Sequence, residues 1–306
     1  MANSRVPKKW ISEQACVSMA HTCNLYCVYC HNPPTGEKKD AGQTAAEMKA
    51  AGVKAVSLEG GGEPTASPDF FKWIKALKAA GVKDIMLSTN AVALADRAFC
   101  RKAVPAVNFF TVNFPSHRPE VYARITRSVK FPQAVRGLAN IKALGGEEKI
   151  RFFHIISSEN YRLLPGFANW AAKNFPRAAF INFTFVRNKG RAPAAPGIVP
   201  SYREVAPFLA LALASLKLRG FRAVVQNMPL CALAGVEGFS FEYQRWRRGD
   251  KVLEGGVDAA APCRACARCT LAPACCGARP DYIKVRGAGE LKASKLDPRS
   301  IIPEDF

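Results

Sequence analysis

The stretch Cys23-Asn-Leu-Tyr-Cys27-Val-Tyr-Cys30 sets three cysteines in the spacing C-x3-C-x2-C. It follows a short apolar segment, Ala15–Met19, which is typical of a β-strand. A structural zinc site usually uses four ligands, and a fully ligated iron–sulfur cluster also needs four. Three closely spaced thiolates therefore predict a cubane cluster that keeps one iron open for a substrate or cofactor. A zinc knuckle completed by His21 or His31 is the alternative interpretation.

Further apolar segments follow along the chain and alternate with amphipathic helical stretches. This order indicates an α/β protein with a parallel sheet and crossover helices. Each segment is almost continuously hydrophobic, as expected of a strand that is covered on both faces. The predicted strands are Ala15–Met19, Lys54–Glu59, Asp84–Thr89, Ala106–Asn113, Lys149–Ser157 and Ala179–Val186.

Helical periodicity fills most of the stretches between these segments. Four helices are followed by a glycine, which favours a left-handed C-terminal cap. The stretch Arg187–Pro200 is rich in Pro, Gly and Ala and is predicted to be a loop. The predicted helices are Ala45–Ala51, Asp69–Ala80, Leu94–Lys102, Pro132–Leu144, Leu163–Asn174 and Tyr202–Arg219, and the capping glycines are Gly52, Gly81, Gly145 and Gly220.

Composition is that of an ordinary globular protein, with 306 residues, 49% hydrophobic and 22% charged. The longest nearly apolar run, Phe208–Leu216, is far shorter than the roughly 18 to 20 residues of a membrane helix. Residues Met1–Trp10 are polar and basic and do not resemble an export signal, so a cytoplasmic protein without membrane contact is expected. The net charge is 44 − 24 = +20, and residues 1–230 carry 32 − 14 = +18 of it. Such a field attracts acidic partners.

A second group of cysteines lies near the C-terminus, after the alternating pattern has ended at Gln226. Its spacing is Cys263-x2-Cys266-x2-Cys269-x5-Cys275-Cys276, with Cys231 upstream. So short a region would lack a core of its own, and the density of thiols predicts a small domain stapled by metal. In contrast, Cys16 in the first strand and Cys100 on a helix are predicted to be small buried hydrophobic residues.

The first cysteine motif, together with Gly60-Gly61-Gly62-Glu63-Pro64 after the second strand, resembles the radical S-adenosylmethionine (radical SAM) superfamily. The resemblance implies a partial (β/α)6 TIM-like barrel over residues 11–226. It also implies that Cys23, Cys27 and Cys30 hold a 4Fe-4S cluster whose open iron chelates S-adenosylmethionine. In this family, the cluster's electron cleaves that cofactor to a 5′-deoxyadenosyl radical, which abstracts hydrogen from the substrate.

The cofactor contacts that this resemblance implies lie at the ends of several strands. Glycines let the backbone approach a ligand closely, and Glu63 can accept a hydrogen bond from an ammonium. Ala91 stands where the family usually has glycine, Arg124 competes with Arg127, and a plain helix cap or a solvated basic face would also explain some of these residues. The implied contact residues are Tyr29, Gly61, Gly62, Glu63, Ser88, Asn90, Asn113 and Arg127.

The C-terminal spacing Cys266-x2-Cys269-x5-Cys275 is similar to the auxiliary-cluster motif of SPASM and Twitch domains. The full seven-cysteine SPASM pattern is absent from the sequence, so one auxiliary 4Fe-4S cluster over residues 227–306 fits better than two. The implied ligands are Cys231, Cys266, Cys269 and Cys275, with Cys263 and Cys276 as alternates. A structural zinc held by the same thiolates is the other interpretation.

The substrate class follows from the resemblance and the charge. SPASM and Twitch extensions favour a peptide or protein side chain that is crosslinked, oxidised or epimerised. The basic core favours an acidic peptide or a phosphorylated substrate, and a nucleotide, nucleotide-sugar or tRNA is the alternative. An electron donor such as flavodoxin or ferredoxin is implied, while a non-enzymatic electron carrier or a zinc-stabilised binding protein is the competing class. Tyr122, His154, Tyr161 and Tyr243 are expected to be structural.

Overall fold

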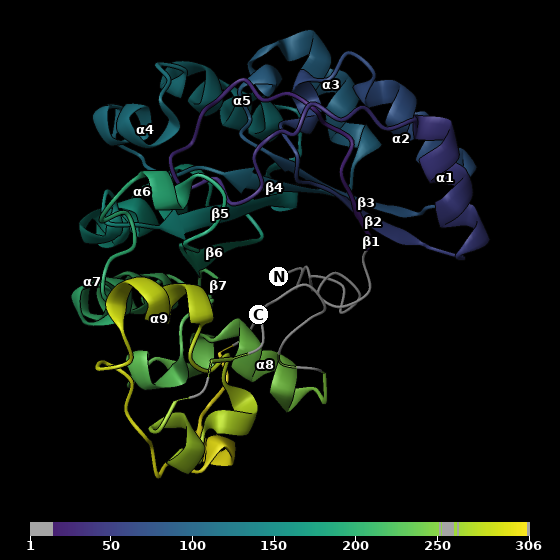
Figure 1. Ribbon diagram of the computed structural model, residues 1–306. Coiled ribbons are helices and arrows are strands. Elements are labelled where there is room, and N and C mark those ends of the chain that lie inside the picture. Colours follow the sequence, from purple (N-terminus) through teal and green to yellow (C-terminus); the bar gives the residue numbers. More distant parts are fainter. Residues whose placement is uncertain (1–14, 251, 253–259, 262, 305–306) are drawn as a thin grey trace.

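The computed structural model describes residues 15–250, 252, 260–261 and 263–304 (Figure 1). The segment Met1–Trp10 and the predicted start of the core at residue 11 lie outside the described residues. Seven parallel strands form one sheet, in which each strand pairs with the one that precedes it in the sequence. The strands are β1 (Ala15–Val17), β2 (Ala55–Leu58), β3 (Asp84–Thr89), β4 (Phe109–Asn113), β5 (Ile150–Ile156), β6 (Phe180–Phe185) and β7 (Ala223–Gln226).

Helices cover one face of the curved sheet, and β1 and β7 form its two edges (Figure 1). The predicted partial α/β barrel is therefore confirmed. The helices of the barrel are α1 (Ala41–Ala50), α2 (Phe70–Ala79), α3 (Arg97–Ala106), α4 (Pro119–Thr126), α5 (Phe131–Ala143), α6 (Leu164–Asn174) and α7 (Tyr202–Leu218).

The two faces of the sheet differ in chemistry because successive side chains of a strand point to opposite faces. In β5, Ile150, Phe152, His154 and Ile156 are buried, and the ring of His154 lies 4.0 Å from that of Phe167 on α6. The intervening residues of β5 are only partly buried on the concave face. His154 therefore faces the helices and not the barrel lumen, and it is a structural residue.

The structure corrects two details of the predicted secondary structure. The sheet has seven strands and not six, because β7 is a four-residue segment that gives too short a pattern to identify. Helix α4 was not predicted either, since its eight residues are flanked and interrupted by arginines. In contrast, Gly52, Gly81, Gly145 and Gly220 all have the left-handed conformation that was predicted for C-terminal caps.

Cys16 and Cys100 were predicted to be buried, and this is right for only one of them. Cys100 belongs to α3 and is buried in the core, whereas Cys16 is exposed on the concave face of β1. The Cys16 thiol donates a hydrogen bond to Oε1 of Glu59 at 3.0 Å. The prediction failed because a three-residue strand with one apolar neighbour on each side does not show which face is covered.

The C-terminal extension begins after β7 and packs against the end of the sheet (Figure 1). Among its described residues are two short α-helices, α8 (Phe241–Arg247) and α9 (Pro280–Arg286), and several 3-10 turns. The ring of Tyr282 on α9 stacks at 3.9 Å on Tyr202 of α7, and the hydroxyl of Tyr243 donates to the carbonyl of Ile301 at 2.7 Å. Aromatic packing therefore joins the extension to the barrel.

Candidate active site

The first cysteine loop, residues 18–30, follows β1 and is fixed by backbone hydrogen bonds to the end of α4. The amide of Tyr26 donates a hydrogen bond to the carbonyl of Thr126 at 2.9 Å. The amide of Val28 donates one to the carbonyl of Ile125, also at 2.9 Å. Cys27 is buried, while Cys23 and Cys30 are partly exposed. The frame of the loop is thus set by the barrel, and it presents three thiols from one short segment.

Burial dominates the electrostatics of these thiols. It raises the pKa of Cys27 to about 12, and it also raises the pKa values of Cys23 and Cys30. The guanidinium of Arg191 opposes this shift at all three cysteines. Thiolates in so buried an environment need a nearby cation to compensate their negative charge, and a metal centre supplies one.

The loop after β6 closes on the first cysteine loop. The amide of Arg191 donates to the carbonyl of Cys30 at 2.8 Å, and its guanidinium lies 3.6 Å from the centre of the Tyr26 ring. Gly190 has φ +61°, and a Cβ there would lie 2.3 Å from the carbonyl oxygen of Cys30. Only glycine fits this approach. The sequence indicated a loop at Arg187–Pro200, but not that it contacts the cysteines.

The Gly-Gly-Glu segment lies at the carboxyl end of β2, against the same cysteine loop. Gly62 has φ +145°, and a Cβ there would lie 2.2 Å from the carbonyl oxygen of Thr22. A Cβ at Gly61 would meet the hydroxyl of Ser18 at 2.6 Å. The glycines therefore let the β2 turn and the cysteine loop touch, which is a packing requirement in addition to any approach of a ligand.

The carboxylate of Glu63 is buried and joins the ends of β2 and β3. Its Oε1 accepts hydrogen bonds from the hydroxyls of Thr65 and Thr89, at 2.6 and 2.7 Å. Its Oε2 accepts from the amide of Asn90 at 2.7 Å. Burial raises the pKa of Glu63, and these hydrogen bonds oppose the shift. Glu63 therefore has a structural role, because its hydrogen bonds hold two strand ends together. Its predicted contact with the cofactor stays a prediction.

Several of the other predicted contact residues lie near the carboxyl ends of the same strands and their neighbours. Nδ2 of Asn90 donates to Oδ1 of Asn24 at 2.6 Å, and the buried hydroxyl of Tyr29 donates to Oδ1 of Asn113 at 3.1 Å. Ser88 donates to Oε2 of Glu59 at 3.4 Å. Strands β3 and β4 are thereby tied to the cysteine loop.

Ala91 explains a departure from the family pattern. It is buried with φ +63°, a conformation in which glycine is less strained than alanine. The turn therefore keeps the glycine-like backbone that the resemblance implies, although the residue differs.

The two competing arginines have different surroundings. Arg127 is the left-handed cap of α4, with φ +53°, and its side chain is exposed. Arg124 forms an ion pair with Glu159, at 3.0 Å between Nε and Oε2. Arg124 is therefore already partnered, and the cofactor contact predicted for Arg127 stays a prediction.

The second cysteine group surrounds a cavity of about 490 Å³ in the extension. Cys231, Cys266, Cys269 and Cys275 all line it, which is the ligand set implied by the sequence. The cavity walls are otherwise mostly apolar, with Leu271, Leu291 and Pro229 among them. Cys276 also contributes to the lining, whereas Cys263 does not appear in it. Cys276 is thus the better placed of the two alternates.

Backbone amides point at these thiols. Sγ of Cys275 accepts from the amides of Leu230 and Gly277, at 3.2 and 3.3 Å. Sγ of Cys269 accepts from the amide of Ser294 at 3.3 Å. Amide donors around sulfur stabilise thiolate ligands and tune a bound cluster. The predicted ligands therefore have outer hydrogen-bonding partners that the sequence did not reveal.

The spacing of the thiols can be tested against the two kinds of metal centre. Within the part of the chain that the structure describes, no three His, Cys, Asp or Glu side chains converge on a single-ion site. Zinc–thiolate bonds of about 2.3 Å require the sulfurs to meet around one atom. A cubane instead receives its thiolates at separate corners. Which of the two centres these thiols hold stays a prediction.

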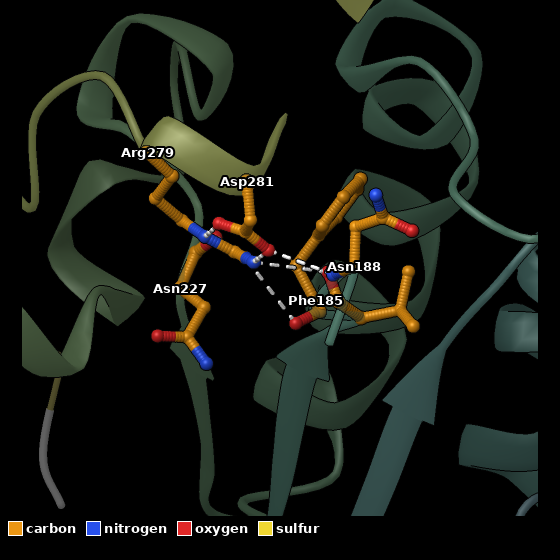
Figure 2. Close-up of polar contacts among 6 residues, drawn as sticks. Phe185, Asn188, Asn227, Arg279 and Asp281 are labelled. Carbon is orange, nitrogen blue, oxygen red and sulfur yellow. Dashed lines mark hydrogen bonds and ion pairs between the residues drawn. The ribbon is translucent and has the colours of Figure 1, made fainter. Parts of the chain in front are cut away.

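A buried ion pair fixes the extension on the barrel. Figure 2 shows Arg279 and Asp281 of the extension beside Phe185, Asn188 and Asn227. Nη2 of Arg279 lies 2.5 Å from Oδ2 of Asp281, and Nη1 donates to the carbonyl of Asn227 at 3.0 Å. The amide of Asn188 donates to Asp281 at 2.7 Å. The ends of β6 and β7 are therefore joined to the segment that follows the cysteines.

Comparison with known proteins decides the family. Residues 17–171 match the family model described as Radical SAM superfamily. The chain belongs to the radical SAM superfamily. Membership makes it an enzyme that uses a 4Fe-4S cluster and S-adenosylmethionine, as the sequence predicted.

Radical SAM relatives match parts of the chain. It is 27% identical over 183 residues to the GTP 3′,8-cyclase of Limosilactobacillus fermentum, covering 56% of this chain and 54% of that protein. It is 28% identical over 181 residues to the mycofactocin maturase MftC of Mycobacterium tuberculosis, covering 56% and 44%. The chain thus spans about half the length of the curated relatives it matches.

Solved radical SAM structures support the fold. The structure titled native anSMEcpe with bound AdoMet and Kp18Cys peptide matches with a TM-score of 0.58 at 15% identity, covering 82% of this chain and 70% of that one. The maturase HydG from Carboxydothermus hydrogenoformans matches with a TM-score of 0.50 at 12% identity, covering 74% and 56%. None of the helices in the described part of the chain has the length and apolar character needed to span a bilayer.

Sequence reasoning missed a set of polar side chains inside the barrel. On the concave face, Nδ2 of Asn182 donates to Oε1 of Gln226 at 3.0 Å, and Thr184 donates to Asn182 at 2.9 Å. Arg151 lies on the same face of β5. These residues interrupt apolar strands at every second position, and that alternation was the available signal.

Proposed function

We propose that this radical SAM enzyme abstracts hydrogen from a peptide or protein side chain, and that it crosslinks, oxidises or epimerises that side chain. The observation that carries the proposal is the cavity lined by Cys231, Cys266, Cys269 and Cys275, in an extension bonded to the ends of β6 and β7. Four thiols, of which Cys269 and Cys275 accept hydrogen bonds from backbone amides, would suit an auxiliary 4Fe-4S cluster. The mycofactocin maturase among the relatives also supports a maturase activity.

Two regions of the barrel would have different roles, one in binding the cluster and the cofactor and the other in binding the substrate. Cys23, Cys27 and Cys30 would hold the first 4Fe-4S cluster, which supplies the electron that cleaves S-adenosylmethionine to a 5′-deoxyadenosyl radical. That cofactor would be oriented at the carboxyl ends of β2 and β3 by Glu63, Asn90 and the glycine turn. The concave face would bind the substrate and exclude water, because enclosed sites protect reactive species.

A nucleotide substrate is the second candidate, and two observations favour it. Residues 1–230 carry a net charge of +18, which would attract phosphates. The GTP 3′,8-cyclases among the relatives act on GTP by their names. An acidic peptide and a phosphorylated substrate share the anionic character that the barrel would select. We further propose that an acidic flavodoxin or ferredoxin supplies the electron.

The test is metal content after anaerobic purification and reconstitution. Wild type should carry about eight irons, and Cys23, Cys27 and Cys30 changed together to Ala should leave about four. The matched variant changes Cys231, Cys266, Cys269 and Cys275 to Ala, and it should also leave about four. About four irons in wild type with one zinc retained would make the extension a structural staple and remove the main support for a peptide substrate.

Substrate class is tested by binding and by chemistry. Anaerobic formation of 5′-deoxyadenosine by the reconstituted enzyme is expected, and its absence would leave an electron carrier as the better explanation. Binding of an acidic peptide pool and of tRNA would then be compared at two salt concentrations. Binding to tRNA that disappears with modest salt reflects only the general field of the protein.

A further inference from the structure

One layer of polar side chains crosses the concave face of the sheet. The strand register pairs Ser88 of β3 with Thr111 of β4, and Thr111 with Arg151 of β5. Side chains of directly paired residues point to the same face of a sheet. Glu59, which follows β2, accepts a hydrogen bond from Ser88 and ends the row. A carboxylate and a guanidinium thus stand at opposite ends, with two hydroxyls between them.

Two neighbouring members of this row carry buried polar atoms without partners. Within the described residues, Nε of Arg151 and Oγ1 of Thr111 are buried and make no hydrogen bond. A buried donor left unpaired costs about 1–3 kcal/mol, so native proteins retain few of them. That two occur on paired residues of adjacent strands indicates one missing complementary group.

The guanidinium of Arg151 is also short of negative charge. Its Nη2 contacts Sδ of Met86 at 2.9 Å, and its Cζ lies 5.4 Å from the centre of the Phe180 ring. A thioether is a weak acceptor, and a ring offers only a cation–π contact. Burial lowers the pKa of Arg151 to about 10, although Glu59 opposes the shift. Arg151 as a whole is partly buried, but a cation whose Nε is enclosed in these surroundings is costly unless an anion joins it.

Other arginines of the barrel form ion pairs with carboxylates. Arg118 and Arg124 form ion pairs with Glu120 and Glu159, at 3.1 and 3.0 Å, on the exposed surface. Glu59 does not serve Arg151 in this way, because its carboxylate oxygens accept from Cys16, Ser57 and Ser88. The charge of Arg151 is therefore directed at the lumen.

We propose that Arg151 and Thr111 form a subsite of the barrel that binds an anionic group of the substrate, a carboxylate or a phosphate. The planar guanidinium can donate two parallel hydrogen bonds to either oxyanion, and the threonine hydroxyl can donate a third. This inference rests on the proposed function, in which the concave face binds the substrate. The subsite would select the acidic peptides or nucleotides considered above by a specific contact rather than by net charge alone.

The experiment measures binding of two probes, inorganic pyrophosphate and glutarate, by calorimetry. The reconstituted enzyme with S-adenosylmethionine bound is compared with Arg151→Gln, Thr111→Val and the control Arg248→Gln, which alters a surface pair with Asp250. Arg151→Gln should weaken binding of at least one probe about tenfold or more, and Thr111→Val about threefold to fivefold. Arg248→Gln should not change it. Tighter pyrophosphate binding would indicate a phosphate, and tighter glutarate binding a carboxylate.

Equal probe affinity in wild type and Arg151→Gln would overturn the subsite. If Arg151→Gln does not fold, an unchanged affinity in Thr111→Val would overturn it instead. The KM for S-adenosylmethionine should be the same in all variants, because the proposed subsite does not contact the cofactor. A raised KM in Arg151→Gln would assign the residue to the cofactor and reject the substrate subsite. Anion binding without 5′-deoxyadenosine in wild type would reject the proposed function and keep the subsite.

Discussion

The two cysteine regions of this protein are held in opposite ways. The loop that carries Cys23, Cys27 and Cys30 is fixed by backbone bonds to α4 and by the Gly190–Arg191 turn. The thiols of the extension instead surround a cavity of about 490 Å³, in a region whose described residues have little regular structure. A large core stabilises the first region, whereas we propose that the second also needs a bound metal centre for its stability. Experiments that separate these two situations are therefore informative.

Metal removal should produce the largest difference between the two regions. Anaerobic chelation should speed amide exchange in residues 263–304 by more than about tenfold, because the emptied cavity removes the contacts that order them. Exchange in β2 to β6 should stay the same, since those strands are stabilised by the core. Mass spectrometry of deuterated peptides measures both. Equal acceleration in barrel and extension would contradict this account of the difference.

Loss of the buried arginine should come next. Arg279→Ala leaves Asp281 charged and buried, which is expected to cost about 3–5 kcal/mol in the free energy of unfolding. The control Arg248→Ala removes a partly exposed pair with Asp250 and should cost about 0–1 kcal/mol. Urea unfolding gives both values. A small effect at Arg279 would mean that aromatic packing alone joins the extension to the barrel.

A third change acts on the first cysteine loop only. Gly190→Ala places a Cβ against the carbonyl of Cys30 and should destabilise the protein by about 1–3 kcal/mol. Gly197→Ala lies in the same loop with φ +80° and open space around it, so it should cost only about 1 kcal/mol of backbone strain. Thermal unfolding compares the two variants. Similar melting temperatures would show that the contact with Cys30 is not required.

The smallest expected effect is the loss of stability at mildly acidic pH. The pKa of His154 is lowered to about 3 by burial, against about 6.5 for histidine in the unfolded chain. The unfolded state therefore binds more protons between these values, and stability falls as pH drops through that window. From pH 7 to 5.5 the histidine should cost about 1 kcal/mol. Urea midpoints at the two pH values should differ less in His154→Phe, and an equal difference would remove His154 as the cause.

Asp281 of the extension responds in a lower range of pH. The Arg279 guanidinium holds the pKa of its carboxyl below the usual value, although burial opposes this. Its contribution is therefore present above the ordinary aspartate pKa and is lost only as pH falls below about 4. The barrel should thus weaken at mild acidity through His154, before the joint to the extension does.

Sequence patterns predicted most of the barrel because its strands are apolar and its helices end in glycine caps. Cys231, Cys266, Cys269 and Cys275 line one cavity, and their role as ligands stays a prediction. The patterns could not show β7, whose four residues are too few for a period. They also missed the contact between Gly190 and Cys30, because nothing in a loop sequence encodes its distant neighbour.

The face of a strand was the hardest feature to predict. His154 and Arg151 both lie in β5, in a stretch that looks continuously apolar apart from these two residues. Their separation by three positions places them on opposite faces, one against α6 and one in the lumen. Register and curvature, which the sequence does not display, decide which of the two can meet a substrate.

The contact between Gly190 and the first cysteine loop also has a consequence for synthesis. Strands pair in the order in which they are made, so the barrel can assemble progressively as the chain leaves the ribosome. The cysteine loop is translated before β6, and Arg191 completes its surroundings only after β6 has been made. Iron delivered earlier would meet three thiols that still lack this part of their enclosure.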